Sequence, residues 1–281
     1  MPLLKRAGKP ALNYVQDDYT DTWKNAGTIL LQHGYGRSSK FWYRWIPYLS
    51  RYYRIVRLDL RGFGESPVDF DPHTDLTLDA HIEDITALLD HLELDSVHYA
   101  GESFGGILGM VLTATQPKRI RTLTLVSSPV HLTEKHLSNT AFGYPSRVEY
   151  LRAKGSKQWA VDVNALNRFP AGTDAGLLEW YASEMGKTHV EILVEQYLLQ
   201  SKASARDLLP RIEAPVLGLY PTSGAVTSSD QEVLLKAGIR NLNLVHLPTS
   251  NHSIAMLHAA TCARHMLHFA AQHDGLACHE A

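Results

Sequence analysis

Cysteine is scarce in this chain, and no long apolar run occurs in it. The 281 residues include two cysteines, Cys262 and Cys278, both near the C-terminus and far from any grouping with metal-ligand spacing. They make no disulfide framework, so we expect free thiols in a reducing compartment, with the cytoplasm as the default location. The longest apolar stretches, such as residues 215–220, are too short to cross a bilayer. No apolar segment of signal-peptide type follows the basic residues near the N-terminus.

The chain also lacks a large excess of positive or negative residues. The 27 Lys and Arg residues nearly balance the 29 Asp and Glu residues, which gives a formal net charge of −2. This balance gives no reason to expect nucleic acid or an anionic membrane surface as a partner. The 15 histidines are scattered and have no carboxylates or thiolates at ligand spacing, so we predict no metal site and no cofactor. The oligomeric state stays open, and a homo-oligomer is compatible with the sequence.

The composition is that of an ordinary globular enzyme, with 44% hydrophobic and 20% charged residues. Short apolar runs that favour β-strands alternate with stretches that favour helices. Because these runs are continuously apolar, they predict an α/β fold with a mostly parallel sheet covered by helices on both faces. The predicted strands are residues 28–31, 54–58, 97–100, 123–126, 216–219 and 242–245, and the predicted helices are residues 39–50, 77–91 and about 254–271.

This alternation stops between residues 130 and 209. The segment has no convincing strand, contains many aromatic residues and is typical of several helices, and the strand pattern resumes at Pro215. We therefore predict an α/β core in two parts, residues 1–129 and 210–281, with a helical insertion at residues 130–209 that acts as a lid.

The segment Gly101–Gly106 is the most informative part of the chain. It lies between a β-favouring segment at residues 95–100 and an apolar, helix-compatible segment at residues 107–115. A serine flanked by glycines at a turn from strand to helix is typical of a nucleophile elbow. The glycines leave room for a sharp turn that holds Ser103 in a strained backbone conformation with its Oγ raised clear of the sheet. The same pattern also occurs in glycine-rich turns with an ordinary surface serine, so the context decides between the two.

Ser103 needs a base to take its proton, and a histidine late in the chain is the expected source. His252 is our candidate, because it lies in the loop between the last predicted strand and the C-terminal helix. Other histidines of this region are more simply explained as surface or helix-packing residues, namely His246, His258, His265 and His268. The sequence therefore predicts Ser103 and His252 as the catalytic residues.

Acyl transfer also needs N–H donors for the oxyanion that develops on the substrate. The N–H of Phe104, directly after the nucleophile, is one expected donor, and the helix that begins there aims its N–H groups at the same place. The second expected donor is the N–H of Tyr35, in the loop His33–Gly36 that follows the first predicted strand. We expect the His33 side chain to hold this loop by hydrogen bonds and to take no direct part in catalysis.

Together these residues resemble the α/β-hydrolase superfamily over nearly the whole chain. The resemblance rests on the H-G-x-G loop at His33–Gly36, the D-x-R-G-x-G-x-S segment at Asp59–Ser66, the elbow at Ser103 and the late His252. It implies a serine hydrolase with a helical lid inserted after the sixth strand. The segment Glu179–Gly186 is similar, more distantly, to lids of enol-lactonase-like and C–C-bond hydrolase-like members.

The triad acid of this superfamily has no obvious counterpart in the sequence. Gly224 stands where the resemblance places an aspartate, and the alternative position after the preceding strand reads Ser127-Ser128-Pro129. Three explanations stay open. In the first, a carboxylate from another part of the chain acts as the triad acid, and Glu134 and Asp230 are the nearest candidates in sequence. In the second, Ser103 and His252 act as a dyad without an acid, and in the third, the site no longer hydrolyses a substrate.

Two acidic residues near the motifs have simpler explanations. Asp230 fits the first turn of a helix, where negative charge is favourable. Glu102 adjoins Ser103, but a residue next to the nucleophile on an elbow generally points away from it, so we expect Glu102 to have a structural role.

These observations favour a cofactor-free serine hydrolase that cleaves a small carboxylic ester, lactone or related acyl compound through an acyl-enzyme on Ser103. The expected partner is a small molecule in a pocket lined by aromatic residues of the lid. A C–C-bond hydrolase of the ring-cleavage type and an amidase on the same site stay open, and a cofactor-independent oxygenase centred on histidine is more remote. From another class, a non-hydrolytic, receptor-like ligand-binding module also stays open, because fold does not fix function.

Overall fold

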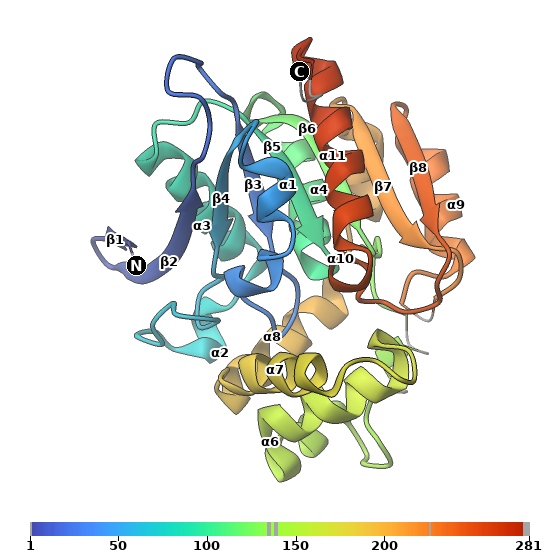
Figure 1. The fold of residues 1–281 in the computed structure, drawn as a ribbon. Helices are drawn as coiled ribbons and strands as arrows, with labels where there is room; N and C mark the ends of the chain where they lie inside the picture. Colours follow the sequence, from blue (N-terminus) through green and yellow to red (C-terminus); the bar gives the residue numbers. More distant parts are fainter. Residues whose placement is uncertain (1, 134–135, 138–139, 225, 278–281) are drawn as a thin grey trace.

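The computed structural model describes residues 2–133, 136–137, 140–224 and 226–277, and within them an eight-stranded sheet forms the centre of the molecule (Figure 1). The strand order is β1-β2-β4-β3-β5-β6-β7-β8, in which β3 to β8 are parallel and β1 and β2 are antiparallel to their neighbours. The strands are β1 (Leu3–Arg6), β2 (Lys9–Asp17), β3 (Thr28–Gln32), β4 (Arg54–Leu58), β5 (Val97–Glu102), β6 (Ile120–Val126), β7 (Val216–Pro221) and β8 (Leu242–Leu247).

The six predicted strands correspond to β3 to β8, which confirms the mostly parallel sheet. β3 and β5 are buried at every position, as expected for central strands with helices on both faces. The hairpin β1–β2 is absent from the sequence-based prediction. It lies at the sheet edge with exposed and partly exposed side chains on both strands, and Lys5, Arg6 and Lys9 interrupt the apolar signal there.

The helices occupy the connections between the parallel strands. The single helix expected at residues 39–50 is instead two short turns, because Pro47 lacks the N–H that an incoming helix needs and is favoured in the first turn of a new one. The helices are α1 (Ile46–Leu49), α2 (Pro72–Asp75), α3 (Leu78–His91), α4 (Phe104–Thr115), α6 (Arg147–Val163), α7 (Ala175–Gly186), α8 (Val190–Lys202), α9 (Ser229–Gly238), α10 (Ile254–Leu257) and α11 (Ala259–Asp274); the short 3₁₀ or π-helical turns are η1 (Ser39–Trp42), η2 (Pro117–Arg119), η3 (Asn164–Arg168) and η4 (Arg206–Arg211).

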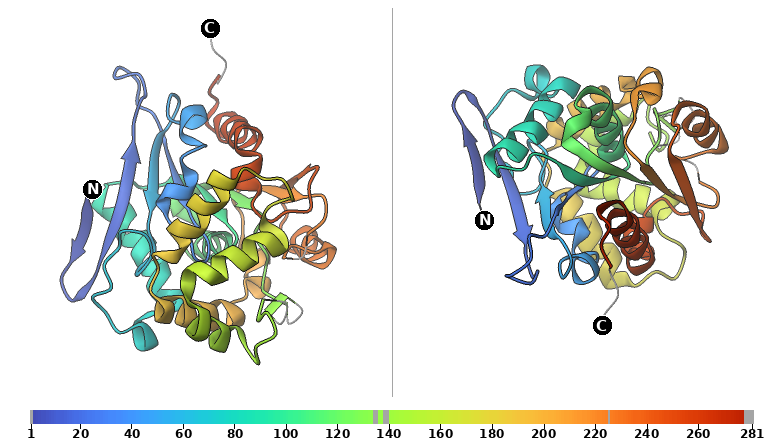
Figure 2. Two further views of the ribbon diagram at one scale, coloured as in Figure 1. Left: turned by 60° about the horizontal axis from the view of Figure 1, so that its bottom comes forward. Right: turned by 90° about the horizontal axis from the view of Figure 1, so that it is seen from above.

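Two hydrophobic cores hold the helices against the two faces of the sheet. One core includes Ile85 of α3 and Leu108 of α4, and the other includes Leu49 of α1 and Met266 of α11. The view from above in Figure 2 shows the sheet between these two layers. Helices on both faces explain why the central strands β3 and β5 are buried throughout their length.

The chain between β6 and β7 carries α6, η3, α7 and α8, which we call the inserted helices. They lie beyond the carboxyl ends of the parallel strands, at the bottom of Figure 1. Aromatic side chains join them to the loops after the strands, since the rings of Tyr35 and Trp159 are 5.1 Å apart and those of Phe41 and Tyr181 are 4.6 Å apart. The limits of a lid at residues 130–209 stay a prediction.

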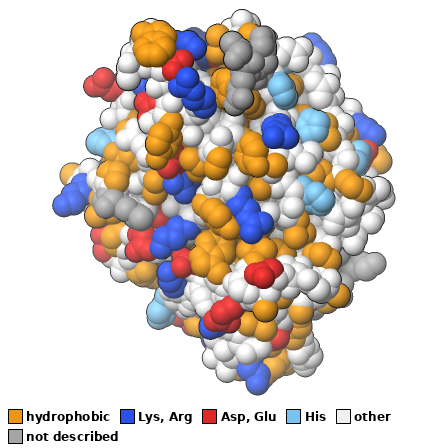
Figure 3. Space-filling model, in the orientation of Figure 1, with side chains coloured by type: hydrophobic (Ala, Val, Ile, Leu, Met, Phe, Trp, Pro, Cys, Tyr) orange, Lys and Arg blue, Asp and Glu red, His pale blue; other side chains and the backbone are white. Residues whose placement is uncertain are grey.

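Among the described residues, no helix is long and apolar enough to span a membrane. On the face shown in Figure 3, hydrophobic side chains lie among charged ones over both the sheet layers and the inserted helices. The exposed large hydrophobic residues belong to separate elements, namely Leu3, Tyr19, Trp23, Tyr43, Val68, Val161, Leu166, Val233 and Leu276.

Candidate active site

Ser103 lies in the tight turn between β5 and α4. Its backbone angles are φ 54° and ψ −119°, in the left-handed region that non-glycine residues rarely adopt. The Ser103 N–H donates a hydrogen bond to the carbonyl of Val126, 3.0 Å away, which fastens the turn to β6. This is the geometry expected of a nucleophile elbow.

Gly105 is required at this turn because the neighbouring loop lies against it. A Cβ at Gly105 would lie 2.5 Å from the carbonyl oxygen of Gln32 and 2.7 Å from that of His33. Both contacts are with backbone atoms, which cannot move aside as a flexible side chain could. The glycine therefore lets the loop after β3 approach the first turn of α4.

The structure brings His252 to Ser103, although 148 residues separate them. The distance between His252 Nε2 and Ser103 Oγ is 3.1 Å, a hydrogen-bonding distance. His252 follows β8 and precedes α10, as the sequence predicts. The loop is also tied to the inserted helices, because the His252 N–H donates to the carbonyl of Asn167 at 2.9 Å and the Ser253 N–H to that of Arg168 at 3.4 Å.

The other ring nitrogen of His252, Nδ1, is buried and has no hydrogen-bond partner among the described residues. Gly224 places no carboxylate there, and Asp230 is an exposed residue in the first turn of α9 with no bond to His252. Ser127 and Ser128 follow β6 without an acid, and Glu134 lies outside the described residues. Within the described part of the chain, the site is thus a serine and a histidine without a third member.

The two expected oxyanion donors lie on the loops that meet at Ser103. In the described part of the molecule, neither the Tyr35 N–H nor the Phe104 N–H donates to a protein acceptor. His33 holds the first loop, since its Nε2 accepts a hydrogen bond from the Leu60 N–H at 3.0 Å while its Nδ1 lies 2.8 Å from the Gly34 carbonyl oxygen. Both N–H groups remain free to bind a ligand oxygen, and their role as an oxyanion hole stays a prediction.

Glu102 points into the interior and pairs with Arg37. The carboxylate Oε2 lies 3.3 Å from Arg37 Nη1, and both side chains are almost fully buried. Arg37 Nε also donates to the Tyr181 hydroxyl, which is 3.2 Å from the Ser253 hydroxyl. This network joins the elbow, α7 and the histidine loop, so Glu102 has the structural position expected for it.

The environment of His252 favours its neutral form. Burial lowers the pKa of the imidazole well below its ordinary value, and the positive charges of Arg37 and Arg168 lower it further. A neutral imidazole can accept the Ser103 proton at and below neutral pH. The same cations oppose the imidazolium that forms afterwards. Glu102 offsets the charge of Arg37, whereas Arg168 has no ion-pair partner among the described residues.

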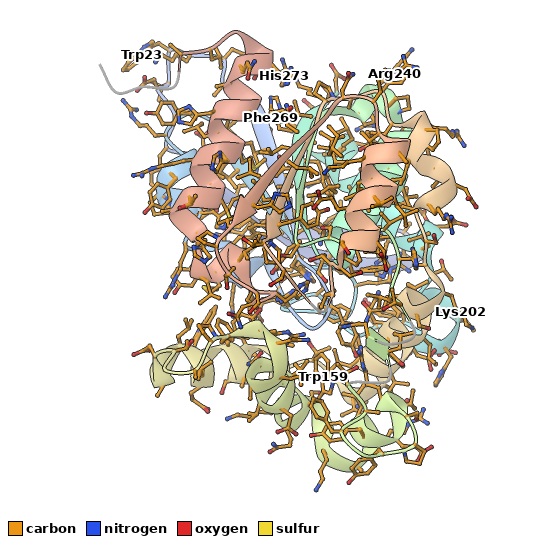
Figure 4. The ribbon with its side chains drawn as sticks, turned by 90° about the vertical axis from the view of Figure 1, so that its right-hand side faces the viewer. Trp23, Trp159, Lys202, Arg240, Phe269 and His273 are labelled. Atoms are coloured by element: carbon orange, nitrogen blue, oxygen red, sulfur yellow. The ribbon has the colours of Figure 1, made fainter. Side chains whose placement is uncertain are left out.

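A small cavity lies beside Ser103 and His252, between the sheet and the inserted helices. Its volume is about 30 Å³, counted as the space open to the centres of water molecules, which is room for about two or three waters. Substrate pockets are typically about ten times larger, so a substrate must displace part of the wall. The lining includes Tyr35, Trp159 and His136, and Figure 4 shows Trp159 among the inserted helices below the sheet.

Three buried arginines also line this cavity, namely Arg37, Arg147 and Arg168. Arg147 is the first residue of α6, and Arg168 is the last residue of η3. The sequence-based prediction does not include Arg147 or Arg168, because an arginine in a helical segment is normally an exposed residue. No local pattern distinguishes these two from the exposed arginines of the same segment.

Outside this cavity, one group of the described residues has ligand atoms close enough to share a metal ion, namely His73, Glu191 and Glu195. Arg152 already donates two hydrogen bonds to Glu191, and His73 lies 2.8 Å from Glu195. These contacts explain the group as an exposed ion-pair network. Cys262 is buried and free, as expected, and Cys278 lies outside the described residues.

Comparisons of the sequence and the structure with known proteins find a matching family and similar folds. The sequence model described as alpha/beta hydrolase fold matches residues 27–259, which is most of the chain. The enol-lactonase of Burkholderia xenovorans has a similar structure, with a TM-score of 0.84 and 23% sequence identity; the match covers 96% of this chain and 99% of the other. At this identity the similarity shows the fold alone.

Two curated relatives bear on the chemistry. RutD of Variovorax paradoxus, a carbamate hydrolase by name, is 25% identical over 250 residues, covering 87% of this chain and 91% of the relative. The 2-hydroxy-6-oxo-2,4-heptadienoate hydrolase of Pseudomonas putida is 30% identical over 167 residues, covering 55% of this chain and 59% of the relative. Matches to several other relatives span between a quarter and about half of the relative's length.

Proposed function

We propose that this chain, which belongs to the alpha/beta hydrolase fold family, is a cofactor-free serine hydrolase that cleaves small carboxylic esters or lactones through an acyl-enzyme on Ser103. The predicted family and fold class are confirmed by the family match and by the similar solved structures. The observation that supports the activity best is the 3.1 Å contact between His252 Nε2 and Ser103 Oγ, at an elbow that faces a small cavity.

The proposed reaction begins when Ser103 Oγ attacks the substrate carbonyl carbon and its proton passes to His252 Nε2. The tetrahedral oxyanion would accept hydrogen bonds from the N–H groups of Tyr35 and Phe104. As the bond to the leaving oxygen breaks, His252 gives its proton to that oxygen, and the acyl group stays on Ser103. A water molecule, deprotonated by the same imidazole, then releases the carboxylic acid and restores the serine.

The lack of an acid partner for His252 among the described residues limits the substrates that we propose for this site. In triad enzymes the acid orients the imidazole and stabilises the imidazolium, and its loss costs a large factor in rate. Here the backbone contact from the His252 N–H to Asn167 holds the loop instead, but it leaves the imidazolium uncompensated. We therefore propose activated or strained acyl substrates, such as aryl esters and lactones, rather than peptides or unactivated amides.

A fluorophosphonate probe tests this proposal, because it reacts covalently with an activated serine. We expect the wild-type protein to gain the mass of one adduct and Ser103→Ala to gain none, with matching loss of aryl-ester turnover. His252→Ala should label at least about a hundredfold more slowly, since general-base catalysis contributes roughly that factor. Labelling that persists in Ser103→Ala would place the reactive group elsewhere.

A non-hydrolytic ligand-binding module is the second candidate, and the partnerless His252 Nδ1 is the observation that favours it. Such a module would retain the cavity and bind a small molecule without turning it over. Absence of labelling between pH 6 and 9, together with saturable ligand binding, would favour this candidate. C–C-bond cleavage remains a variant of the first proposal, and product analysis with a vinylogous diketone separates it from ester hydrolysis.

A further inference from the structure

Two cationic side chains of the inserted helices reach the cavity beside Ser103. Arg147 and Arg168 are 2% and 5% exposed, so their guanidinium groups are removed from bulk water. Both lie against the same aromatic ring, with the Cζ atoms of Arg147 and Arg168 5.6 and 5.1 Å from the ring centre of Trp159. The two charges therefore share one small enclosed space with the proposed nucleophile.

The contacts of these two arginines are with neutral groups. Arg147 donates to the Thr140 hydroxyl and lies over the Tyr197 ring, with its Cζ 4.2 Å from the ring centre. Arg168 donates to Asn164 Oδ1 at 3.3 Å and approaches the Met185 sulfur at 2.9 Å.

Within the described part of the chain, neither Arg147 nor Arg168 forms an ion pair with a carboxylate. The described carboxylate of Glu102 pairs with the third arginine, Arg37, and its charge also favours the protonated form of Arg168. Three arginines therefore line the cavity, and the one described carboxylate that pairs with any of them leaves two positive charges without an ion-pair partner.

A buried charge without a partner of opposite sign costs free energy, and the lowered pKa of Arg168 is a consequence of this cost. Burial lowers the pKa of Arg168 to about 9, and the positive charges of Arg37 and Arg147 contribute. Aromatic rings offset only part of this cost, because cation–π contacts are weaker than charge pairs. A site that keeps two such cations gains most when an anion enters it, since hydrogen bonds between guanidinium and carboxylate are among the strongest in proteins.

We propose that Arg147 and Arg168 bind a carboxylate of the substrate, so that the site takes acid-bearing acyl compounds such as half-esters of dicarboxylic acids or lactones with a free acid group. This inference rests on the proposed hydrolase function, and it names the substrate class. The bond cleaved is still the acyl–oxygen bond at Ser103, and the free carboxylate is a binding group that takes no part in bond making. The small cavity fits such a group, since a carboxylate has two oxygens and the space holds about two or three waters.

Carboxylate binding would also assist the base. The carbonyls of Asn167 and Arg168 accept hydrogen bonds from the His252 and Ser253 N–H groups, so an anion that fixes η3 also fixes the histidine loop. Its negative charge would stabilise the imidazolium that the neighbouring cations oppose. We therefore expect the carboxylate to raise kcat as well as to lower KM, whereas a merely structural role of the arginines predicts neither effect.

The test compares two aryl esters of equal length, mono(para-nitrophenyl) glutarate and para-nitrophenyl valerate, which differ in a terminal carboxylate or methyl group. The wild-type protein should prefer the charged ester by at least about tenfold in kcat/KM, the factor that 1.4 kcal/mol represents. Arg147→Met and Arg168→Met should each remove most of this preference, measured as the ratio of kcat/KM for the two esters within the same variant. Methionine keeps an unbranched apolar stem in place of each arginine stem and removes the charge.

Two further variants separate loss of the carboxylate contact from loss of structure. Arg168→Lys retains the charge without the planar fork and should keep part of the preference. Arg240→Met is the matched control, because Arg240 is exposed and Figure 4 shows it at the end of the molecule opposite Trp159. Circular dichroism and the melting temperature establish that each variant is folded before its kinetics are compared.

Glutarate binding to Ser103→Ala, measured by calorimetry, separates this inference from the proposed function. If neither ester is cleaved but glutarate binds in a manner that Arg168→Met abolishes, the carboxylate site stands and the hydrolase proposal fails. If both esters are cleaved at equal rates, the hydrolase stands and the carboxylate site is refuted.

Discussion

Replacement of Glu102 by glutamine tests the buried charges around the elbow most sharply. The carboxylate lies 3.3 Å from Arg37 Nη1, and the two side chains are 5% and 1% exposed. Two unit charges at that separation attract each other by about 5 kcal/mol at an effective dielectric constant of about 20. Removing one partner of a buried pair typically costs about 3–5 kcal/mol, because the other charge stays buried without compensation.

We therefore expect Glu102→Gln to lower the free energy of unfolding by about 4 kcal/mol, which corresponds to a fall of roughly 10 °C in melting temperature for a domain of this size. Urea unfolding, followed by circular dichroism, measures the loss. Glu213→Gln is the control, because Glu213 is an exposed carboxylate. Its unfolding free energy should change by less than about 0.5 kcal/mol.

Adding Arg37→Met to Glu102→Gln removes the uncompensated charge, so the double variant should recover about half of the lost stability. The reasoning is refuted if Glu102→Gln costs less than about 1 kcal/mol, or if the losses of the two single variants simply add in the double variant. Either result would mean that solvent or another group already compensates Arg37.

Three further changes test other parts of the site. Gly105→Ala should destabilise the protein by about 3 kcal/mol or more in urea unfolding, because its Cβ would lie 2.5 Å from the Gln32 carbonyl oxygen. Gly176→Ala, at an exposed position in the first turn of α7, should leave stability unchanged or slightly raised. As the pH falls, kcat/KM should decline with a midpoint below pH 6.5, because the pKa of His252 is lowered and the imidazole acts as a base only when neutral. Arg168→Met should move this midpoint to higher pH, because it removes a nearby positive charge. A midpoint at or above pH 6.5 in the wild-type protein would contradict the buried, cation-flanked imidazole. Gly224→Asp should raise kcat on aryl esters by at least about tenfold and raise the pKa of His252 if the new carboxylate reaches Nδ1; an unchanged rate in a folded variant would show that the loop does not present position 224 to His252.

The sequence predicts those parts of the fold that depend on residues close together in the chain. The turn at Ser103 needs small residues on both sides, and the sequence has Gly101 and Gly105 at these positions. Short apolar runs predict β3 to β8. In the central strands β3 and β5, burial on both faces leaves no room for polar alternation, whereas β8 lies at the sheet edge and is only partly buried. The hairpin β1–β2 has a weaker signal, since its edge position allows Lys5 and Lys9 among its residues.

The parts that sequence does not predict depend on contacts between distant segments. Arg147 and Arg168 have no signature in their own helical turns, and their burial follows from the packing of α6 and η3 around Trp159. The pairing of Arg37 with Glu102 is likewise visible only when the loop after β3 meets the end of β5. The absence of an aspartate at Gly224 is visible in the sequence, but its consequence for His252 Nδ1 is a three-dimensional fact.

Kinetics of Ser103→Ala, His252→Ala and the double variant on one aryl ester provide the most direct measurement of whether the serine and the histidine act as one unit. If His252 serves only to activate Ser103, all three variants should show the same residual kcat/KM, because removing either member already removes the function of both. If the losses of the two single variants multiply in the double variant, the two residues act independently, and the hydrogen bond between them is not the centre of the reaction.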